Sequence, residues 1–236
     1  MIPKTIHYVW FGGKPLTPLA EKCIASWRKN CPDYEIVRWD ESNFDTHQNR
    51  YCREAYEAEK WAFASDYARL WVLVHMGGIY MDTDVQVLRP LDRFLGEEAF
   101  SGFEAEDRLP TGLMAAEKGQ PFFEKLLHDY DERSFLSEDG SPVLTTNVEY
   151  ITEACLSAGL RLDNTKQTVE GFTLYPSDYF CPKDWLTRKV ELTDNSYAIH
   201  HFDGSWVDGK TRIKNEIMHF IGPKGVRLAK KIIGKG

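Results

Sequence analysis

Two aspartates two residues apart, Asp82 and Asp84, are the residues of this sequence best suited to chemistry. They directly follow the short apolar run Ile79–Met81, and in an extended chain their side chains point to the same side. Two carboxylates at the end of a buried strand repel each other and lose solvation unless a positive group lies beside them. A hard divalent cation that also binds phosphate oxygens fits this position. Asp82 and Asp84 are therefore candidate catalytic residues.

A charged pair lies on the helix predicted just before these aspartates. Asp66 and Arg69 are three residues apart, so they share a helical face. A surface ion pair is the plainer interpretation. The apolar residues around the pair indicate a mostly buried helix, however, and a buried charged pair needs a polar ligand. The hydroxyl groups of a sugar would supply one, so Asp66 and Arg69 are also candidate catalytic residues.

The segments that position these residues alternate between strand and helix patterns. The first half is expected to contain strands over residues 5–11, 34–39, 79–81 and 85–88, helices over 19–29 and 61–75, and a helical insertion around 40–60. The second half is less regular, with strands expected over 100–103, 112–116 and 197–201 and helices over 122–130 and 148–158. This order predicts an α/β fold with a mostly parallel sheet and helices on its faces. Ligands bind such sheets at the carboxyl ends of the strands, where Asp82 and Asp84 lie.

Composition and charge exclude several classes of protein. The 236 residues carry a net charge of −7 with no dominant basic patch, so nucleic acid is not expected as a partner. The five cysteines are odd in number and form no CxxC pair, which favours free thiols in a reducing compartment. The start lacks the features of a signal peptide, and no apolar stretch approaches the roughly 20 residues that span a bilayer. We expect one domain over residues 1–236 in the cytoplasm.

The longer pattern around both motifs is far more specific than the D-x-D triplet alone. It reads S-D-x-x-R from Ser65 to Arg69 and G-G-x-Y-x-D-x-D from Gly77 to Asp84. Two further motifs accompany it, I-P-K-T-I-H-Y-V-W-F-G over residues 2–12 and H-H-F-D-G-S-W over residues 200–206. Together they closely resemble the DXD-containing glycosyltransferases of family 32. That family includes yeast initiating mannosyltransferases, bacterial capsular and lipooligosaccharide sugar transferases, and relatives of clostridial glucosylating toxins.

The resemblance implies a GT-A fold with a Rossmann-like central sheet and a retaining, metal-dependent transfer. The donor would be a nucleotide-sugar carrying a hexose or N-acetylhexosamine, with UDP-sugars ahead of GDP-mannose. The acceptor would be a glycan or a lipid-linked glycan. The short chain resembles bacterial members that build capsule or lipopolysaccharide at the inner face of the cytoplasmic membrane. Mn²⁺ is the expected cofactor and Mg²⁺ the alternative, since an imidazole ligand favours the softer ion.

Carried over by position, the resemblance also assigns roles to individual residues. Asp84 would bind the metal, Asp82 would contact the donor or reach the metal through water, and Asp66 and Arg69 would hold the transferred sugar. The other nucleotide-sugar-binding residues that it implies are His7, Val9, Trp10, Tyr80 and Trp206.

A histidine would complete the metal site, and His200 and His201 are both candidates. Adjacent strand residues point to opposite sides, so only one of them can reach the metal easily. The spacing to the Ser205-Trp206 pair of the family favours His200. Many relatives carry Thr-Gly-Pro before a later helix, whereas this chain has the stretch 145–148, in which Thr146 and Asn147 are both candidate helix caps.

Two alternative functions and one further partner fit parts of the sequence. A glycoside hydrolase could use Asp82 and Asp84 as its carboxylate pair, but the charged pair on the helix and the late histidine would have no role in it. A non-catalytic carbohydrate-binding protein would need no metal site matched to a diphosphate. The basic tail over residues 224–236 could contact an anionic membrane surface, or it could be a solvated or docked segment.

Overall fold

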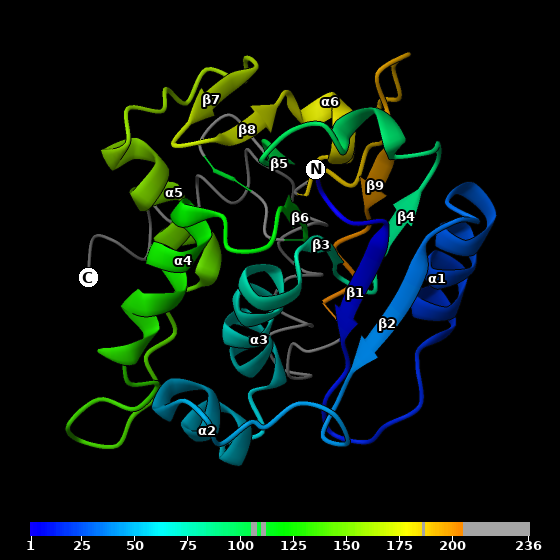
Figure 1. Ribbon diagram of the computed structural model, residues 1–236. Coiled ribbons are helices and arrows are strands. Elements are labelled where there is room, and N and C mark those ends of the chain that lie inside the picture. The colour runs from blue at the N-terminus through cyan, green and yellow to red at the C-terminus, as the bar shows by residue number, and fades with distance from the viewer. Residues whose placement is uncertain (105–107, 110–111, 186, 205–236) are drawn as a thin grey trace, which may run out of the picture.

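The computed structural model describes residues 1–104, 108–109, 112–185 and 187–204 (Figure 1). Its elements in chain order are β1 (Thr5–Val9), α1 (Pro18–Asn30), β2 (Glu35–Trp39), α2 (Arg50–Glu57), α3 (Trp61–Met76), β3 (Gly78–Met81), β4 (Val85–Val87), η1 (Asp92–Phe94), β5 (Ala99–Gly102), β6 (Leu113–Ala116), α4 (Pro121–His128), η2 (Asp129–Asp131), α5 (Asn147–Ser157), β7 (Gln167–Val169), β8 (Phe172–Tyr175), α6 (Ser177–Phe180) and β9 (Ala198–His200).

The main sheet of the described chain has the strand order β2-β1-β3-β6-β5-β8-β7. Strand β1 is parallel to both β2 and β3, and β5 is parallel to β8. Strand β6 is antiparallel to both β3 and β5, so β3 and β5 point the same way. Only β6 and β7 are therefore reversed in this sheet, which confirms the expected mostly parallel α/β class.

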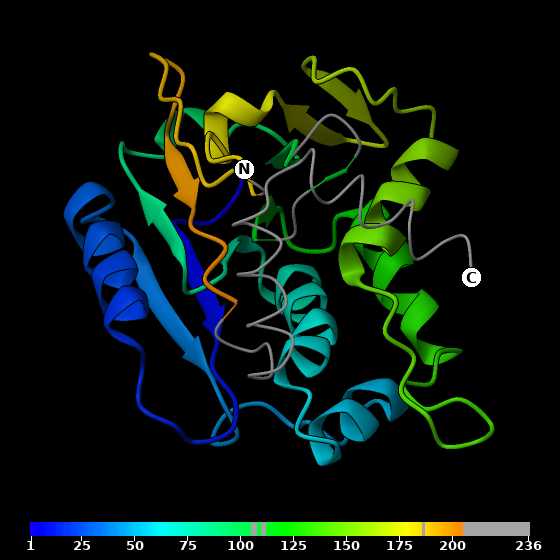
Figure 2. The same ribbon diagram turned by 180° about the vertical axis from the view of Figure 1, so that it is seen from behind.

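Alternating residues of the strands face two different hydrophobic clusters. On β3, Tyr80 belongs to the cluster packed around α3 and α4, whereas Ile79 and Met81 belong to the cluster that includes Trp27 of α1. Figure 2 shows α1 on the back of the sheet, beside the pair of strands β4 and β9. Because side chains alternate along a strand, the register of β3 sends Tyr80 toward α3.

Two glycines make the turn from α3 into β3. Gly77 has φ +69° and Gly78 has φ +99°, and residues with a β-carbon rarely adopt backbone conformations with such positive φ angles. A β-carbon on Gly78 would lie 2.7 Å from the carbonyl oxygen of Thr5 on β1. The glycine pair thus lets β3 enter directly beside β1, with α3 packed on the same sheet. This turn fixes the position of the charged pair on α3 relative to the aspartates after β3.

The strand expected over residues 85–88 forms β4, but β4 does not join the main sheet. It pairs antiparallel with β9, and Val85 lies opposite His200. Trp27 donates its indole N–H to the carbonyl oxygen of Val85 at 2.7 Å, which holds β4 against α1. A turn from Asp82 to Val85 carries the chain out of the main sheet. This turn is the reason that the short second sheet lies next to the D-x-D motif.

Several remaining expectations can be compared with the described residues. The helical insertion expected around residues 40–60 is present as α2, whereas β7, β8 and α6 had no predicted counterpart. All five cysteines are buried and unpaired, as expected for free thiols. No described helix has both the length and the apolar character that a membrane span requires. The basic tail 224–236 lies outside the described residues.

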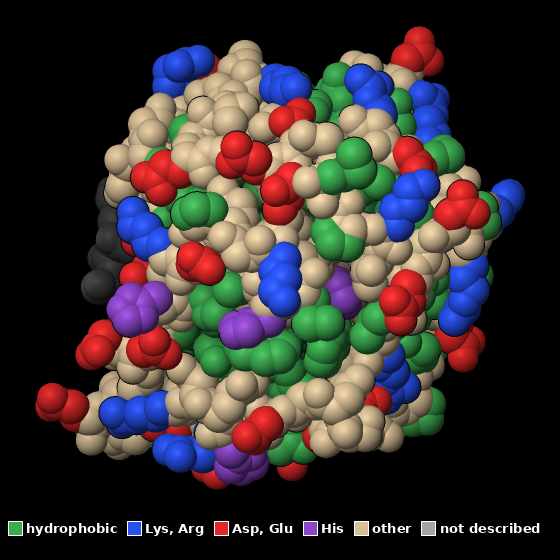
Figure 3. Space-filling view, viewed as in Figure 1, with side chains coloured by type: hydrophobic (Ala, Val, Ile, Leu, Met, Phe, Trp, Pro, Cys, Tyr) green, Lys and Arg blue, Asp and Glu red, His purple; other side chains and the backbone are tan. Residues whose placement is uncertain are grey.

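Figure 3 shows the face of the molecule seen in Figure 1. Acidic and basic side chains are interspersed over it, and hydrophobic side chains gather below its middle. This face therefore carries no continuous basic surface of the kind that follows a nucleic-acid backbone.

Candidate functional site

A cavity of about 860 Å³ opens at the carboxyl ends of β1 and β3. Its wall includes the residues after β1, the first turns of α3, the D-x-D segment and the start of α5. This is the place where parallel α/β sheets bind ligands. Most of the residues singled out from the sequence line this one cavity, among them Val9, Trp10, Asp66, Arg69, Tyr80, Asp82, Asp84 and His200.

Asp66 and Arg69 form a buried ion pair on α3. The guanidinium nitrogen Nη2 of Arg69 lies 3.1 Å from Oδ1 of Asp66, and its Nη1 lies 3.5 Å from Oδ1 of Asp82. The same guanidinium donates to the hydroxyl and the carbonyl oxygen of Ser65. Asp66 is 8% exposed and Arg69 is 4% exposed, so the pair is not a surface salt bridge. Arg69 connects the sequence S-D-x-x-R to the D-x-D motif.

Tyr80 supports this connection from the strand. The guanidinium carbon of Arg69 lies 4.7 Å from the centre of the Tyr80 ring, and the Tyr80 hydroxyl donates to Oδ1 of Asp82 at 2.8 Å. The ring face attracts the cation while the hydroxyl fixes the carboxylate. The tyrosine of the G-G-x-Y-x-D-x-D pattern thus holds two charged residues of the site in place.

The pKa values of both members of the ion pair are raised, that of Asp66 mainly by burial and that of Arg69 by its neighbouring carboxylates. Desolvation raises the pKa of Asp66 to about 6, an effect that Arg69 opposes and that Asp82 reinforces. Burial disfavours the charged form of Arg69, but the carboxylates of Asp82 and Asp66 outweigh it and raise the pKa of the guanidinium above its usual value. Asp66 therefore holds its proton more tightly than an ordinary aspartate, while Arg69 stays charged.

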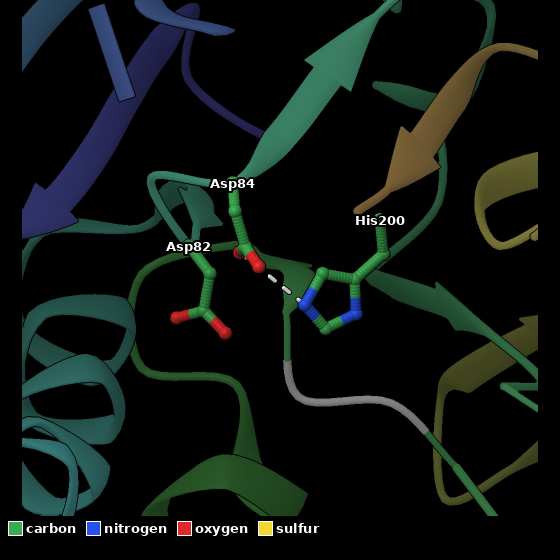
Figure 4. A group of neighbouring side chains, drawn as sticks. All are labelled: Asp82, Asp84 and His200. Atoms are coloured by element: carbon green, nitrogen blue, oxygen red, sulfur yellow. Dashed lines mark ion pairs between the residues drawn. The ribbon is translucent and has the colours of Figure 1, made fainter. Parts of the chain in front are cut away.

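Asp82, Asp84 and His200 come together from two separate segments (Figure 4). One ligand atom from each lies within 4.8 Å of the others. In Figure 4 the two carboxylates extend from the loop after β3, and the imidazole extends from the end of β9 toward Asp84. The Nε2 atom of His200 lies 3.3 Å from Oδ1 of Asp84. Two carboxylate oxygens and one imidazole nitrogen are a donor set that suits a divalent ion such as Mn²⁺.

The backbone around Asp84 sets the position of His200. The pairing of β4 with β9 places Val85 opposite His200. The amide of His201 donates to the Asp84 carbonyl oxygen at 2.9 Å, and the amide of Asp203 donates to Oδ2 of Asp84 at 2.8 Å. Gly112 leaves room for the ring, since a β-carbon there would lie 3.0 Å from Cε1 of His200. One aspartate thus anchors the end of the strand that carries the histidine.

Asp84 and His200 behave as a charged pair. Burial would raise the pKa of Asp84, but the His200 imidazole and the Asp203 amide outweigh it and lower that pKa to about 2. Burial would likewise lower the pKa of His200, and the Asp84 carboxylate raises it well above 6.5. The Nδ1 atom of His200 is buried without a hydrogen-bond partner among the described residues. A cation bound by the two aspartates would take the place of the imidazolium charge, so the donor set fits a divalent metal.

His201 lies outside this group, although it was a candidate metal ligand. Its Nε2 atom lies 3.0 Å from the side-chain oxygen of Gln86 on β4. The reason is the alternation of side chains at the end of β9, which sends adjacent residues to opposite sides. Of the two histidines, the structure therefore brings only His200 to the aspartates.

His7 was expected to line the nucleotide pocket, and it does not line the described cavity. It is 2% exposed and lies two residues before the end of β1. Trp39 donates its indole N–H to Nδ1 of His7 at 3.1 Å, so Nε2 carries the proton and donates to the carbonyl oxygen of Gly77 at 3.0 Å. Burial lowers the pKa of His7 to about 4. His7 thus joins β1 to β2 and to the turn after α3.

The structure confirms Thr146 as a helix cap and adds cavity residues that the sequence motifs did not single out. Thr146 is the N-cap of α5 and forms a capping box with Glu149, and both line the cavity. Glu104, Arg108, Trp185, Arg188 and Phe202 line it as well. The Thr-x-x-Glu spacing was a visible signal for the cap. The others come from irregular loops, where no periodicity or motif marks them. Trp206, expected to bind the nucleotide-sugar, lies outside the described residues.

Comparison with known proteins agrees with these motifs. Residues 18–101 match the family model described as "Glycosyltransferase sugar-binding region containing DXD motif". Inositol phosphoceramide mannosyltransferase 3 of Schizosaccharomyces pombe is 30% identical over 146 residues, which cover 57% of this chain and 38% of that protein. A mannosyl phosphorylinositol ceramide synthase of Saccharomyces cerevisiae is 28% identical over 150 residues, which cover 58% of this chain and 37% of that protein. The resemblance drawn from the sequence is confirmed over this region.

The fold is shared with a solved glycosyltransferase, described as involved in the glycosylation of the major capsid of PBCV-1. The two superpose with a TM-score of 0.51 at 11% identity, over 90% of this chain and 98% of that one. This likeness, together with the order of the sheet, confirms the expected fold class. The chain spans less than half the length of the two yeast relatives described above.

Proposed function

We propose, from the match of residues 18–101 to the sugar-binding region of DXD-containing glycosyltransferases, that the chain is a metal-dependent glycosyltransferase using a nucleotide-sugar donor. The observation that supports this most directly is the arrangement of two groups in one cavity. Asp82, Asp84 and His200 offer a metal-binding group, and the buried pair of Asp66 and Arg69 lines the wall beside it. Arg69 touches both groups, at 3.1 Å from Asp66 and 3.5 Å from Asp82.

Each group has a distinct part in the proposed transfer. A divalent metal, when bound, supplies Lewis-acid stabilisation of the diphosphate as it leaves. Asp84 and His200 would hold that metal, and Asp82 would join them or contact the donor. Asp66 and Arg69 would orient the hydroxyl groups of the transferred sugar. The Asp66 carboxylate would also stabilise positive charge that develops at the anomeric carbon.

The proposed stereochemical outcome is retention. Asp66, Asp82 and Asp84 are engaged by Arg69, Tyr80 and His200, so we assign none of these three carboxylates the role of covalent nucleophile. Attack by the acceptor oxygen on the anomeric carbon, from the same face as the leaving diphosphate, would give retention without a covalent enzyme intermediate. The anomeric configuration of the product tests this directly.

The donor and acceptor follow from chemistry and from the names of the relatives. We propose a UDP-linked hexose or N-acetylhexosamine as the donor and a glycan or lipid-linked glycan as the acceptor, in the synthesis of bacterial surface polysaccharide. The two yeast relatives are named for mannosyl transfer to inositol phosphoceramides. GDP-mannose and a lipid carrying a sugar or inositol headgroup therefore belong in the same assay.

A panel of nucleotide-sugars, assayed for nucleotide release with Mn²⁺, with Mg²⁺ and with a chelator, tests the proposal. We expect release from one donor to depend on the metal and to increase when the correct acceptor is added. Hydrolysis of a plain glycoside without metal would instead identify a glycoside hydrolase. Sugar binding with no response to any nucleotide or metal would identify a carbohydrate-binding protein.

A further inference from the structure

Arg188 lies at the edge of the metal-binding group, in a loop that no motif marks. Backbone pairing closes the loop that contains Arg188. The amide of Glu191 donates to the carbonyl oxygen of Pro182 at 2.9 Å, and Lys183 and Val190 form an isolated antiparallel β-bridge. Within it the amide of Arg188 donates to the carbonyl oxygen of Asp184 at 2.9 Å. Arg188 lines the same cavity as Asp84 and His200.

The Arg188 guanidinium is attached to the backbone just after His200. Its Nη1 donates to the carbonyl oxygen of Phe202 at 2.6 Å and to that of His201 at 3.1 Å. Lys183 donates to the same His201 carbonyl oxygen at 2.7 Å. Two cations of one loop therefore converge on the turn that follows the candidate metal ligand.

That turn is conformationally unusual on both sides of the contact. Arg188 has φ +61° and Phe202 has φ +54°, and residues with a side chain seldom adopt the left-handed region. The turn at Phe202 directs the amide of Asp203 to Oδ2 of Asp84 at 2.8 Å. The Phe202 ring lies 4.2 Å from the His200 ring, centre to centre. The guanidinium thus contacts a segment with an unusual backbone conformation, and that segment itself contacts Asp84 and His200.

The residues assigned so far include no positively charged partner for the diphosphate of the donor. Asp82 and Asp84 together would balance the charge of a divalent metal, and Arg69 lies between Asp66 and Asp82. The diphosphate of a nucleotide-sugar would bring at least two further negative charges. Arg188 has no carboxylate partner among the described residues. Its side chain is exposed and lines the cavity, and its Nη1 atom donates to backbone carbonyl oxygens. Arginine suits this task because its remaining N–H groups can donate to phosphate oxygens.

We infer that Arg188 binds the diphosphate of the donor, with its guanidinium held in place by the carbonyl oxygens of His201 and Phe202. The inference rests on the proposed function, because it takes a nucleoside diphosphate as part of the ligand. It adds a phosphate-binding residue to the site. The position of that residue would depend on the same turn, after His200, that Asp84 holds in place.

Titration calorimetry on the full chain tests the inference with UDP and GDP, each at saturating Mn²⁺, and with Mn²⁺ alone. The variants are Arg188→Gln and Arg188→Lys, and Arg161→Gln is the control because Arg161 is an exposed arginine outside the cavity wall. We expect Arg188→Gln to weaken binding of the recognised diphosphate about 10- to 100-fold, the range for loss of a charge-assisted contact. Arg188→Lys, which keeps the charge, should lose less, and Arg161→Gln should bind like the wild type. The dissociation constant for Mn²⁺ alone should change less than threefold in all three.

The outcomes separate the inference from the proposed function. If the wild type binds neither diphosphate with Mn²⁺, the proposed function itself fails. If the wild type binds one of them and Arg188→Gln binds it equally well, Arg188 has no part in diphosphate binding. Equal losses for Mn²⁺ alone and for the diphosphate would mean that Arg188 only shapes the metal site, which would also overturn the inference.

Discussion

The Nε2 atom of His200 lies 3.3 Å from Oδ1 of Asp84, although one residue follows β3 and the other ends the last described strand. The pairing of β4 with β9 brings the two segments together, and the amides of His201 and Asp203 are both bound by Asp84. Asp84 therefore has two functions in the structure. It is a proposed metal ligand, and it fixes the backbone that carries His200, the third residue of the proposed metal-binding group.

Replacing Asp84 with asparagine is expected to abolish metal-dependent nucleotide release. The change removes the charged ligand while keeping a side-chain oxygen for the Asp203 amide, so the fold should be retained. Loss of the metal anchor should cost several kcal/mol of transition-state stabilisation, a rate reduction of roughly a thousandfold or more. Asp163→Asn, in an exposed loop outside the cavity, is the control. Near-normal Mn²⁺-dependent turnover in a folded Asp84→Asn protein would contradict the assignment.

The two neighbouring histidines provide a matched pair of variants. His200→Ala should weaken Mn²⁺ binding at least tenfold, because it removes a ligand from the group of Asp82, Asp84 and His200. His201→Ala should leave Mn²⁺ affinity within about twofold of the wild type, because its ring is bound to Gln86. Calorimetry or electron paramagnetic resonance of Mn²⁺ measures both constants. A larger loss in His201→Ala than in His200→Ala would reverse the ligand assignment.

The pair of Asp66 and Arg69 should contribute to binding of the sugar part of the donor and not to binding of its nucleotide part. Asp66→Asn keeps the shape of the side chain but removes its charge, so we expect it to weaken binding of the intact donor more than binding of the free diphosphate. The turnover number should fall as well, since the carboxylate is proposed to stabilise charge at the anomeric carbon. Calorimetry with donor and diphosphate, at the same Mn²⁺ concentration, gives the comparison. Equal losses for the two ligands would indicate a purely structural ion pair.

His7 should make folding stability depend on pH in the acidic range. Its pKa is lowered from 6.5 to about 4 in the folded protein, so between these values the unfolded chain binds a proton that the folded one does not. The contribution of His7 to the free energy of unfolding is therefore fully present above pH 6.5 and is lost as the pH falls toward 4. The loss should amount to about 3 kcal/mol at most, from 1.36 kcal/mol for each unit of pKa difference.

Chemical denaturation of the wild type and of His7→Gln between pH 4 and pH 7 measures this effect. The variant should be less stable at neutral pH, because it disturbs the hydrogen bonds with Trp39 and Gly77. It should also lack most of the wild-type loss of stability between pH 6.5 and 4. If both proteins lose the same stability over this range, other groups cause the pH dependence.

The sequence by itself determined the local groups whose members lie close along the chain. The spacing of Asp66 and Arg69 placed them on one helical face, and the D-x-D spacing placed two carboxylates at the end of a strand. Apolar runs and apolar residues at helical spacing identified α1, α3, β1, β2 and β3, because buried elements carry such residues in short, regular segments. The glycine pair marked the turn between α3 and β3. Each of these inferences depends only on neighbouring residues.

Only the tertiary structure decided which distant residues meet. The pairing of β4 with β9 brings His200 to the aspartates and leaves His201 beside Gln86, whereas the sequence kept both histidines as candidates and only favoured His200. His7 lies in a strand that does lead to the cavity, but two residues too early, where Trp39 and Gly77 occupy both ring nitrogens. Arg188 comes from a loop without periodicity. The physical reason is that long-range hydrogen bonds and burial fix these positions, and neither leaves a regular pattern in the sequence.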